Sequence, residues 1–239
     1  MSWGFFWALE GLDGAGKTSL ALSLKNALKA KGIDVVICKE PSLSCYGQKL
    51  RAVLKDGRPV GFSPLDELEL FTKDRVEDLA ENIFPALTAG RTVIVDRYIL
   101  SSVAYQGALG LDPKIILKIN QTFTWPSATF ILDISPQLGL ERVVKGRGDT
   151  PNAAFEKLDY LTKVAAIFQS IDAYNLPHVY RLNAESSLED LTNQALAIMS
   201  RFKEPSNPLT LKRLLPKKKH VWRLNGQLIS GFLNWPLDS

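Results

Sequence analysis

The chain has 239 residues, 46% of them hydrophobic, which suits one large domain or one domain with an appendage. Its two cysteines, Cys38 and Cys45, exclude a disulfide framework and have no partners at metal-binding spacing, so we expect a reduced, cytoplasmic protein without zinc. The formal net charge of +4 arises in residues 205–239, so the nearly neutral remainder gives no reason to expect nucleic-acid binding.

The N-terminal segment "MSWGFFWALEG" lacks the basic region and the cleavage site of a signal peptide. Its apolar run over 5–10 fits a buried strand, and no apolar run in the chain is long enough to span a membrane. Further strands are predicted over 33–39, 92–96, 127–134 and 178–183. Helices are predicted from residue 17 to a stop at Gly32, near 46–55 and over 65–89.

This alternation of strands and helices predicts βαβ units. We therefore expect an α/β domain over residues 1–203, with a five-stranded parallel sheet covered by helices on both faces. Two prolines in "KEPSNP" (203–208) interrupt the last helix, so residues 204–239 are predicted to form a C-terminal extension.

The extension contains Asn225-Gly226 between two apolar stretches, which predicts a β-hairpin. Its lysines at 217–219, with Trp222 nearby, leave two interpretations open. The hairpin docks on the domain, which its many apolar side chains favour, or it is an arm that binds nucleic acid, an anionic surface or a partner.

The segment "GLDGAGKT" (11–18) matches the phosphate-loop pattern G-x-x-x-x-G-K-[ST], with a strand before it and an amphipathic helix after it. Its backbone N–H groups would converge on phosphate oxygens, Lys17 would reach the β- and γ-phosphates, and Thr18 would ligate Mg²⁺. The alternative is a glycine-rich turn that matches the pattern by accident. The strand before the loop and the helix after it argue against this alternative. The motif predicts a nucleoside triphosphate site, whose contacts in this loop would be Gly11, Leu12, Asp13, Gly14, Ala15, Gly16, Lys17 and Thr18.

The pair Asp96-Arg97 follows the predicted strand 92–96. Many ATPases have a second acid here, which positions water, and GTPases have an N-K-x-D motif that this chain lacks. A cation at this position suits the binding of a second phosphate group. The pair therefore predicts phosphoryl transfer between two phosphorylated molecules.

If residues 97–106 are placed on a helix, their polar and apolar side chains fall on opposite sides. One side is apolar, and the other carries two polar stripes, Arg97–Ser101–Tyr105 and Tyr98–Ser102–Gln106. A solvated helix face would favour Lys and Glu, whereas these side chains suit oriented hydrogen bonds. We expect the polar face to border the ligand crevice at the carboxyl ends of the strands.

These features together resemble the thymidylate kinase family over roughly residues 3–200. The matching segments are "LEGLDGAGKT" (9–18), "KEP" (39–41), "LRAVL" (50–54), "ELELFTKDR" (67–75), "IFPALTAGRTVIVDRY" (83–98), "SSVAYQG" (101–107) and "FILDISPQLGLER" (130–142). The "DRY…SS.AYQG" and "LF…R" segments are specific to that family among phosphate-loop proteins.

The resemblance implies a kinase that transfers the γ-phosphate of ATP to dTMP, with Mg²⁺ as cofactor, in a homodimer. It implies that Arg51 and Arg97 hold the acceptor phosphate, for which guanidinium groups are well shaped. It implies that Phe71 stacks on the pyrimidine and that Arg75, on the same helix face, donates to its 4-oxygen. Ser102 and Gln106 would complete the base edge, Tyr105 would pack on the sugar, and Glu40, Pro41 and Ser101 would line the same site.

The resemblance also assigns roles around the metal and the adenine. Asp13 would meet the sugar 3′-hydroxyl or a magnesium-bound water, and Asp96 would support the metal. The adenine would lie against the backbone near "LNAES" (182–186), which includes Asn183. The nucleophile would be an anionic phosphate oxygen, so positioning and charge neutralisation would carry catalysis.

Two segments depart from the family pattern. "KEPSLSC" stands where R-E-P-G-G-T is common, and the lid, about 142–152, lacks the arginine of D-R-x-E because Thr150 follows Asp149. We expect Arg142 and Arg147 to supply the transition-state cation, with a weaker hold on the γ-phosphate. The alternatives are a kinase of another nucleoside monophosphate or of a deoxynucleoside, and a non-catalytic nucleotide-binding protein with a degenerate lid.

Overall fold

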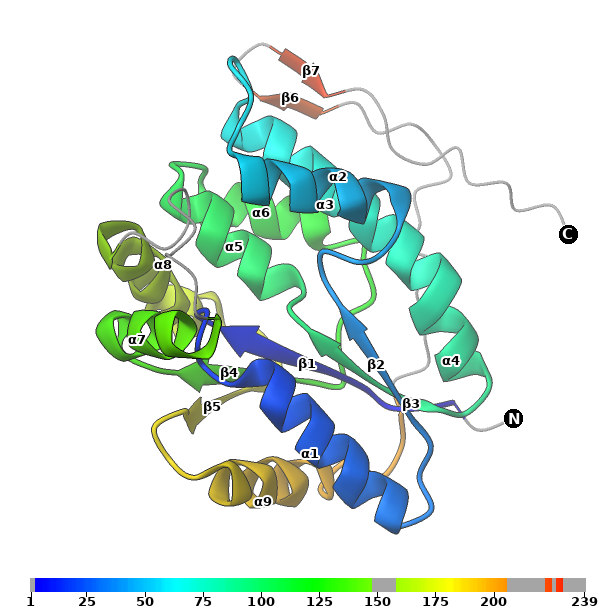
Figure 1. Cartoon of the computed structure of the whole chain (residues 1–239). Coiled ribbons are helices and arrows are strands. Elements are labelled where there is room, and N and C mark those ends of the chain that lie inside the picture. Colours follow the sequence, from blue (N-terminus) through cyan, green and yellow to red (C-terminus); the bar gives the residue numbers. More distant parts are fainter. Residues whose placement is uncertain (1–2, 148–157, 206–221, 225–226, 230–239) are drawn as a thin grey trace, which may run out of the picture.

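The computed structural model describes residues 3–147, 158–205, 222–224 and 227–229. Five parallel strands form one sheet in the order β2-β3-β1-β4-β5, which confirms the predicted α/β fold (Figure 1). The strands are β1 Phe6–Gly11, β2 Val35–Lys39, β3 Thr92–Asp96, β4 Ala128–Asp133 and β5 Val179–Asn183. Each overlaps one of the five predicted strands.

Helices cover both faces of this sheet (Figure 1). The helical elements are α1 Lys17–Ala30, α2 Cys45–Asp56, α3 Pro64–Asp78, η1 Leu79–Ile83, α4 Phe84–Thr88, α5 Ile99–Ala108, α6 Pro113–Asn120, α7 Pro136–Arg147, α8 Leu158–Ser170, η2 Ile171–Tyr174 and α9 Leu188–Met199. The predicted stripe of Leu20, Leu24 and Leu28 is buried, and it packs with α9 in one core on its side of the sheet. Among the described residues, no helix is both long enough and apolar enough to cross a membrane.

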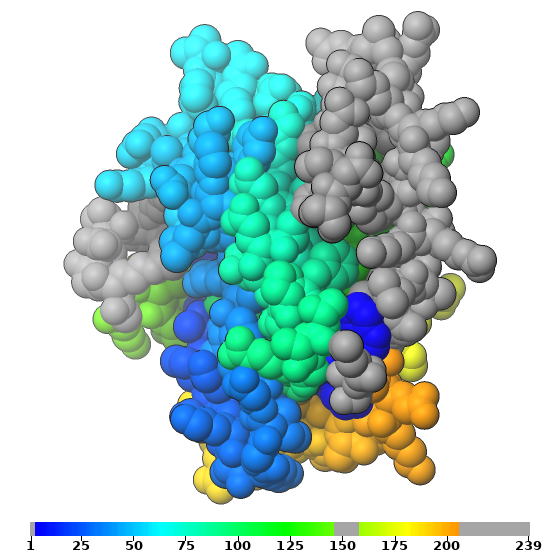
Figure 2. Space-filling model, turned by 90° about the vertical axis from the view of Figure 1, so that its right-hand side faces the viewer, coloured from blue at the N-terminus to red at the C-terminus, as the bar shows by residue number. Residues whose placement is uncertain are grey.

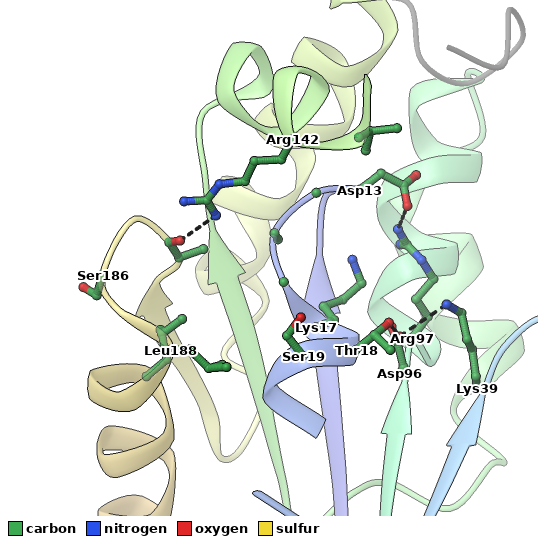
Figure 3. Close-up of a pocket in the computed structure, with 16 residues that line it drawn as sticks. Asp13, Lys17, Thr18, Ser19, Lys39, Asp96, Arg97, Arg142, Ser186 and Leu188 are labelled. Carbon is green, nitrogen blue, oxygen red and sulfur yellow. Dashed lines mark hydrogen bonds and ion pairs between the residues drawn. The ribbon is translucent and has the colours of Figure 1, made fainter. Parts of the chain in front are cut away.

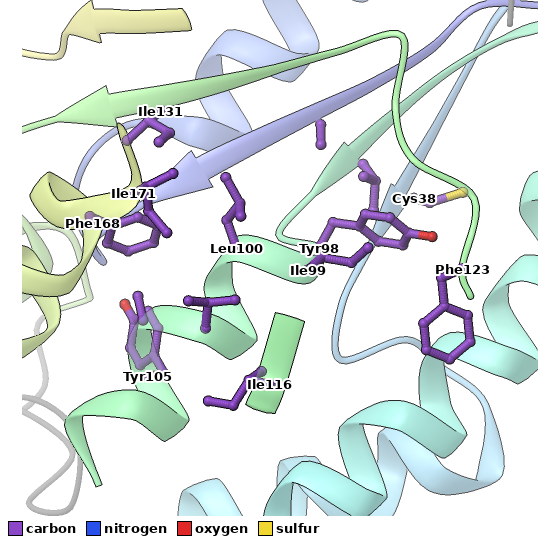
Figure 4. Packing of buried hydrophobic residues seen from close by; sticks show 14 of the residues in the cluster. Cys38, Tyr98, Ile99, Leu100, Tyr105, Ile116, Phe123, Ile131, Phe168 and Ile171 are labelled. Atoms are coloured by element: carbon purple, nitrogen blue, oxygen red, sulfur yellow. The ribbon is translucent and has the colours of Figure 1, made fainter. Parts of the chain in front are cut away.

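The second core lies between the other face of the sheet and α5 (Figure 4). Leu100 and Val103 from α5, Phe168 from α8 and Ile131 from β4 are buried there. Residues 99–106 of α5 are all buried, so this helix has no solvated face. Its polar side chains therefore have to find partners within the protein or in a ligand.

The single helix predicted over 65–89 is wrong in one respect, because a π-helical turn interrupts it. The N–H of Phe84 donates to the carbonyl of Leu79, five residues back, and α4 begins with Pro85 in its first turn. Proline has no backbone N–H to donate, so the regular α-helical hydrogen-bond pattern is interrupted at residue 85. Figure 2 shows α3 and α4 continuing as one band down a face of the molecule.

The helix expected over 97–106 begins later, at Ile99. Arg97 has φ of 74°, in the left-handed region, and therefore precedes the helix. Tyr98 is buried, and its hydroxyl donates to the carbonyl of Thr124 at 2.9 Å. The placement of Arg97 and Tyr98 on a polar helix face was thus wrong, although Ser101, Tyr105 and their neighbours do follow on α5.

The predicted hairpin is confirmed. β6 (Trp222–Leu224) pairs antiparallel with β7 (Gln227–Ile229), with Leu224 opposite Gln227. The turn at 225–226 and the lysines at 217–219 lie outside the described residues, as do the side chains of the hairpin. Docking or binding by the extension, and the domain boundary near 203, stay predictions.

Candidate active site

The phosphate loop joins β1 to α1 and bends at two glycines. Gly14 and Gly16 have φ of 76° and 88°, which glycine adopts without strain. A Cβ on Gly14 would lie 2.1 Å from the carbonyl oxygen of Gly139, so the loop packs directly against the first turn of α7. The loop can hold this close approach only with glycine at position 14.

Lys17 is buried at the base of the loop (Figure 3). Its Nζ donates to the carbonyls of Leu12 at 2.6 Å and Gly11 at 3.1 Å. Burial and the positive charge of Arg97 lower the pKa of Lys17 to about 8, although nearby carboxylates act in the opposite direction. Loop carbonyls thus hold the ammonium group where the motif places it for a phosphate.

Thr18 and Asp96 meet at the carboxyl end of β3. Thr18 Oγ1 donates to Asp96 Oδ2 at 2.5 Å, and Lys39 Nζ lies 3.4 Å from the same oxygen. Burial alone would raise the pKa of Asp96, but Lys17, Lys39 and Arg97 outweigh it and hold the pKa below its usual value. The carboxylate is therefore ionised.

These oxygens fit a magnesium ion. Asp96 Oδ1 is buried without a hydrogen-bond partner in the described part of the chain, so one carboxylate oxygen remains to be satisfied. The same part holds no group of three or more His, Cys, Asp or Glu that could bind a metal alone. Mg²⁺ is commonly held by one or two protein oxygens together with substrate phosphates, and Thr18 with Asp96 supplies such a pair.

A first cavity of about 530 Å³ lies over the phosphate loop (Figure 3). Its lining contains the predicted nucleotide residues Asp13, Gly14, Ala15, Gly16, Lys17 and Thr18. It continues along Ser186, in the predicted adenine segment 182–186, and along Leu188 and Leu191, which the sequence did not single out. The predicted contacts Gly11, Leu12 and Asn183 border a different cavity of about 390 Å³, and Asn183 Oδ1 accepts from the N–H of Glu185.

The lid arginine Arg142 lies at the far end of the first cavity from Thr18 and Asp96. Its Nη1 donates to the carbonyl of Ala184 at 2.9 Å, and Figure 3 shows it extending toward the loop that carries Ser186. Arg147 is the last residue of α7, and its side chain lies outside the described part of the structure, as do residues 148–152 of the lid.

A second cavity of about 300 Å³ lies between α2, α3 and α5. Nine of the predicted acceptor-site residues line it: Glu40, Pro41, Arg51, Phe71, Arg97, Ser101, Ser102, Tyr105 and Gln106. Asp13, Lys39 and Arg97 line both cavities, so these three side chains stand between them. Arg51 reaches its place by donating from Nε to the carbonyl of Ser42 at 3.3 Å and from Nη2 to that of Pro41.

Arg97 extends its guanidinium group across this shared wall. Its Nη2 donates to Asp13 Oδ1 at 2.8 Å and to Tyr105 Oη at 3.1 Å, and its Nη1 donates to Ser101 Oγ at 3.1 Å. The centroid of the Tyr105 ring lies 4.8 Å from the guanidinium carbon of Arg97. These contacts hold the positively charged guanidinium group of Arg97 between the two cavities.

Glu10 holds the turn that presents Arg97, a role that no pattern in the sequence indicates. Its carboxylate is fully buried and accepts from the N–H of Tyr98 at 3.1 Å, the N–H of Leu100 at 2.9 Å and Ser101 Oγ at 2.5 Å. Burial raises the pKa of Glu10, although the hydrogen bond from Ser101 and the charge of Arg97 act to lower it. In the sequence, Glu10 is recognisable only as an acidic residue at the end of the apolar run over 5–10.

Arg75 is the one predicted acceptor residue that does not line the second cavity. It is fully buried behind it, where Nε donates to Glu40 Oε1 at 3.0 Å and Nη2 donates to Ser102 Oγ at 3.1 Å. Asn120, from the unpredicted helix α6, accepts from Nη1. Arg75 therefore supports Glu40 and Ser102 in the wall, and its direct contact with a base stays a prediction.

Several lining residues escaped the sequence analysis. In the second cavity these include Leu54, Lys55 and Glu67, and in the first they include Val143. Glu67 lies in the "ELELFTKDR" segment, but the sequence alone does not distinguish a buried glutamate on a helix from an exposed one. Ala184 lies in the predicted adenine segment 182–186 and lines the first cavity, where its carbonyl accepts from Arg142.

Comparison with known proteins agrees with this geometry. A family model described as thymidylate kinase matches residues 9–195. The probable thymidylate kinase of Archaeoglobus fulgidus is 40% identical over 197 residues, which cover 82% of this chain and 94% of the relative. The thymidylate kinases of Desulfotalea psychrophila and Xanthomonas campestris are 41% and 40% identical, covering 76% and 82% of this chain and 87% and 83% of their own. The chain belongs to the thymidylate kinase family.

Proposed function

We propose that the protein transfers the γ-phosphate of ATP to the phosphate of dTMP, giving ADP and dTDP. The observation that carries this proposal is the shared wall of Asp13, Lys39 and Arg97 between the cavity over the phosphate loop and the cavity under α5. A donor phosphate in the first and an acceptor phosphate in the second would meet at that wall.

The chemistry needs little beyond positioning. A dTMP phosphate oxygen, anionic near neutral pH, attacks the γ-phosphorus, and the bond from that phosphorus to the β,γ-bridging oxygen breaks. No general base is required, because the nucleophile carries no proton to remove. Catalysis comes from alignment and from fixed positive charge around the transferring group.

The described cations can supply that charge. Lys17 lies at the loop that would hold the β- and γ-phosphates, and Arg97 points across the shared wall with Ser101 and Tyr105 as supports. Arg51 lines the acceptor cavity from α2. These groups are already oriented by protein hydrogen bonds, so little reorganisation is needed when charge develops.

Thr18 and Asp96 would hold Mg²⁺, and Asp13 would contribute through a metal-bound water or the sugar 3′-hydroxyl. When bound, the ion neutralises charge on the donor phosphates. The contact of Arg142 with the carbonyl of Ala184 supports a role at the nucleobase end of ATP. We retain Arg147 as the lid cation on the basis of the resemblance.

We also propose that the protein works in the cytoplasm as a homodimer. The low cysteine content supports a reducing compartment. The homodimer is what the family resemblance implies, and sedimentation of the purified protein would test it.

The proposal is tested by ADP release from purified protein with Mg-ATP and separate acceptors: dTMP, dUMP, UMP, CMP, dGMP and thymidine. Strong preference for dTMP, with no turnover of thymidine, is expected, because thymidine lacks the attacking phosphate. Preference for another monophosphate would keep the kinase assignment and change the acceptor. ATP binding without transfer to any acceptor would establish the non-catalytic alternative.

A further inference from the structure

Gln106 lies in the wall of the acceptor cavity with its amide orientation fixed by a buried acid. Only 1% of the residue is exposed, and its Nε2 donates to Glu67 Oε1 at 2.9 Å. A carboxylate can accept hydrogen bonds but cannot donate them. Glu67 can therefore face only the NH₂ end of this amide.

Glu67 is itself held in place. It is fully buried on α3, and Arg58 Nε donates to its Oε2 at 2.7 Å. Arg58 and the Gln106 amide therefore donate to the two oxygens of Glu67, which accepts on both sides. The ion pair thus determines which end of the Gln106 amide is available to a ligand.

The available end is the carbonyl oxygen. Gln106 Oε1 is buried and accepts no hydrogen bond from any described residue. Leaving a buried acceptor without a partner destabilises the protein, so a bound N–H donor would be favoured here. Both Glu67 and Gln106 line the acceptor cavity, which places the unsatisfied group at the site of binding.

Ser102, one helical turn before Gln106, has the opposite polarity. Its Oγ accepts from Arg75 Nη2 at 3.1 Å, and an arginine can only donate. The hydroxyl hydrogen of Ser102 is thereby left to donate to a ligand. The wall offers one donor, at Ser102, beside one acceptor, at Gln106.

We propose that Glu67 is a specificity-determining positioning residue: by fixing the amide of Gln106, it makes the acceptor cavity select a base with a ring N–H beside a carbonyl. Thymine and uracil have this edge. Cytosine in the same pose presents a ring nitrogen acceptor to Gln106 Oε1 and an amino donor to Ser102, so both contacts become mismatched. This inference rests on the proposed function, because it assumes a nucleoside monophosphate in this cavity.

The test compares dTMP with 5-methyl-dCMP, which differ only at the 4-substituent and at N3. Isothermal titration calorimetry without ATP gives the two dissociation constants for wild-type protein and for Glu67→Gln. A glutamine at position 67 can donate or accept, so the Gln106 amide can turn over. We expect the preference for dTMP to fall at least about tenfold in Glu67→Gln, the scale of one buried hydrogen-bond mismatch.

The matched control is Glu69→Gln, on the same helix, where the carboxylate pairs with Lys73 at the surface. It should leave the preference within about twofold of wild type, as expected for a half-buried ion pair that does not line the cavity. If Glu67→Gln does not fold, Gln106→Leu removes the carbonyl directly and should lower the same preference. An unchanged preference in a folded Glu67→Gln or Gln106→Leu variant overturns the proposal, as does an equal change in Glu69→Gln.

Binding and turnover separate the two proposals. A shifted preference in a protein that phosphorylates no monophosphate would sustain the role of Glu67 and reject the kinase function. Normal phosphorylation of dTMP with an unshifted preference in the variants would do the reverse.

Discussion

Glu10 caps the start of α5 from a neighbouring strand: its Oε1 accepts the N–H of Leu100 at 2.9 Å. The helix has no side-chain cap of its own, since its N-cap residue is Tyr98. The same carboxylate accepts from Ser101 Oγ, which in turn accepts from Arg97. One buried acid therefore links the central strand to the arginine between the two cavities.

Replacing Glu10 should affect both stability and acceptor binding. In Glu10→Ala the buried N–H groups of Tyr98 and Leu100 lose their acceptor, so the free energy of unfolding should fall by about 1–3 kcal/mol. The KM for dTMP should rise because Arg97 is no longer held, while Glu10→Gln, which keeps one accepting oxygen, should lie between wild type and Glu10→Ala. Urea unfolding and steady-state kinetics measure these effects. A normal KM in folded Glu10→Ala would contradict the positioning role.

Lys17 should make ATP binding depend on pH. Its pKa in the folded protein is about 8, against an ordinary value of 10.5 for a lysine side chain. Above pH 8 the ammonium loses its proton, so the dissociation constant for ATP should rise with pH, approaching about tenfold per unit. Titration calorimetry between pH 7 and 9.5 measures the slope. Lys17→Met should bind ATP weakly and without this slope, and a wild-type affinity independent of pH would refute the assignment.

The same shift has a stability consequence of defined sign. Between pH 8 and 10.5 an unfolded lysine keeps a proton that folded Lys17 has released. The unfolded state then binds more protons, so the contribution of Lys17 to the free energy of unfolding rises with pH in this window. Comparing wild type with Lys17→Met by urea unfolding at pH 8 and 10 isolates this contribution from other groups.

Gly14→Ala should abolish ATP binding through a steric effect. The new methyl group would lie 2.1 Å from the carbonyl oxygen of Gly139, so the loop and α7 would have to separate. Gly110→Ala is the matched control, because Gly110 also has positive φ, at 100°, but a Cβ there meets nothing within 4 Å. Both should lose about 1–2 kcal/mol of stability from backbone strain, and Gly14→Ala should also lose ATP affinity. Retained affinity in Gly14→Ala would show that the loop adapts.

Arg142→Ala separates two roles for this lid arginine. Its contact with the carbonyl of Ala184 predicts a higher KM for ATP, with turnover at saturating ATP changed by less than about threefold. A transition-state cation would instead lower kcat strongly with little change in KM. Steady-state kinetics at varied ATP distinguish these outcomes, and Lys145→Ala, an exposed cation on the same helix, serves as the control.

The comparison of sequence and structure shows which parts of the site can be predicted. Strand patterns were sufficient for the parallel sheet, and the phosphate loop has a recognisable motif. The roles of the acceptor residues came from the family resemblance. The π-helical turn was missed although Pro85 marks the break in the helix. The left-handed Arg97 was missed because Glu10, distant in the sequence, holds the turn that follows it. Glu10 and Glu67 were missed because a buried acid acts through tertiary partners.

The most direct test of this account is kcat/KM for dTMP in wild-type protein and in Arg97→Ala, with the dissociation constant for ATP measured alongside. Arg97 lies between the two cavities, so its loss should lower kcat/KM for dTMP by at least about 100-fold, consistent with removing a buried charge-assisted contact to phosphate. The affinity for ATP should change by less than about threefold. A kcat/KM for dTMP close to that of wild type in Arg97→Ala would contradict the assignment of the second cavity as the acceptor site.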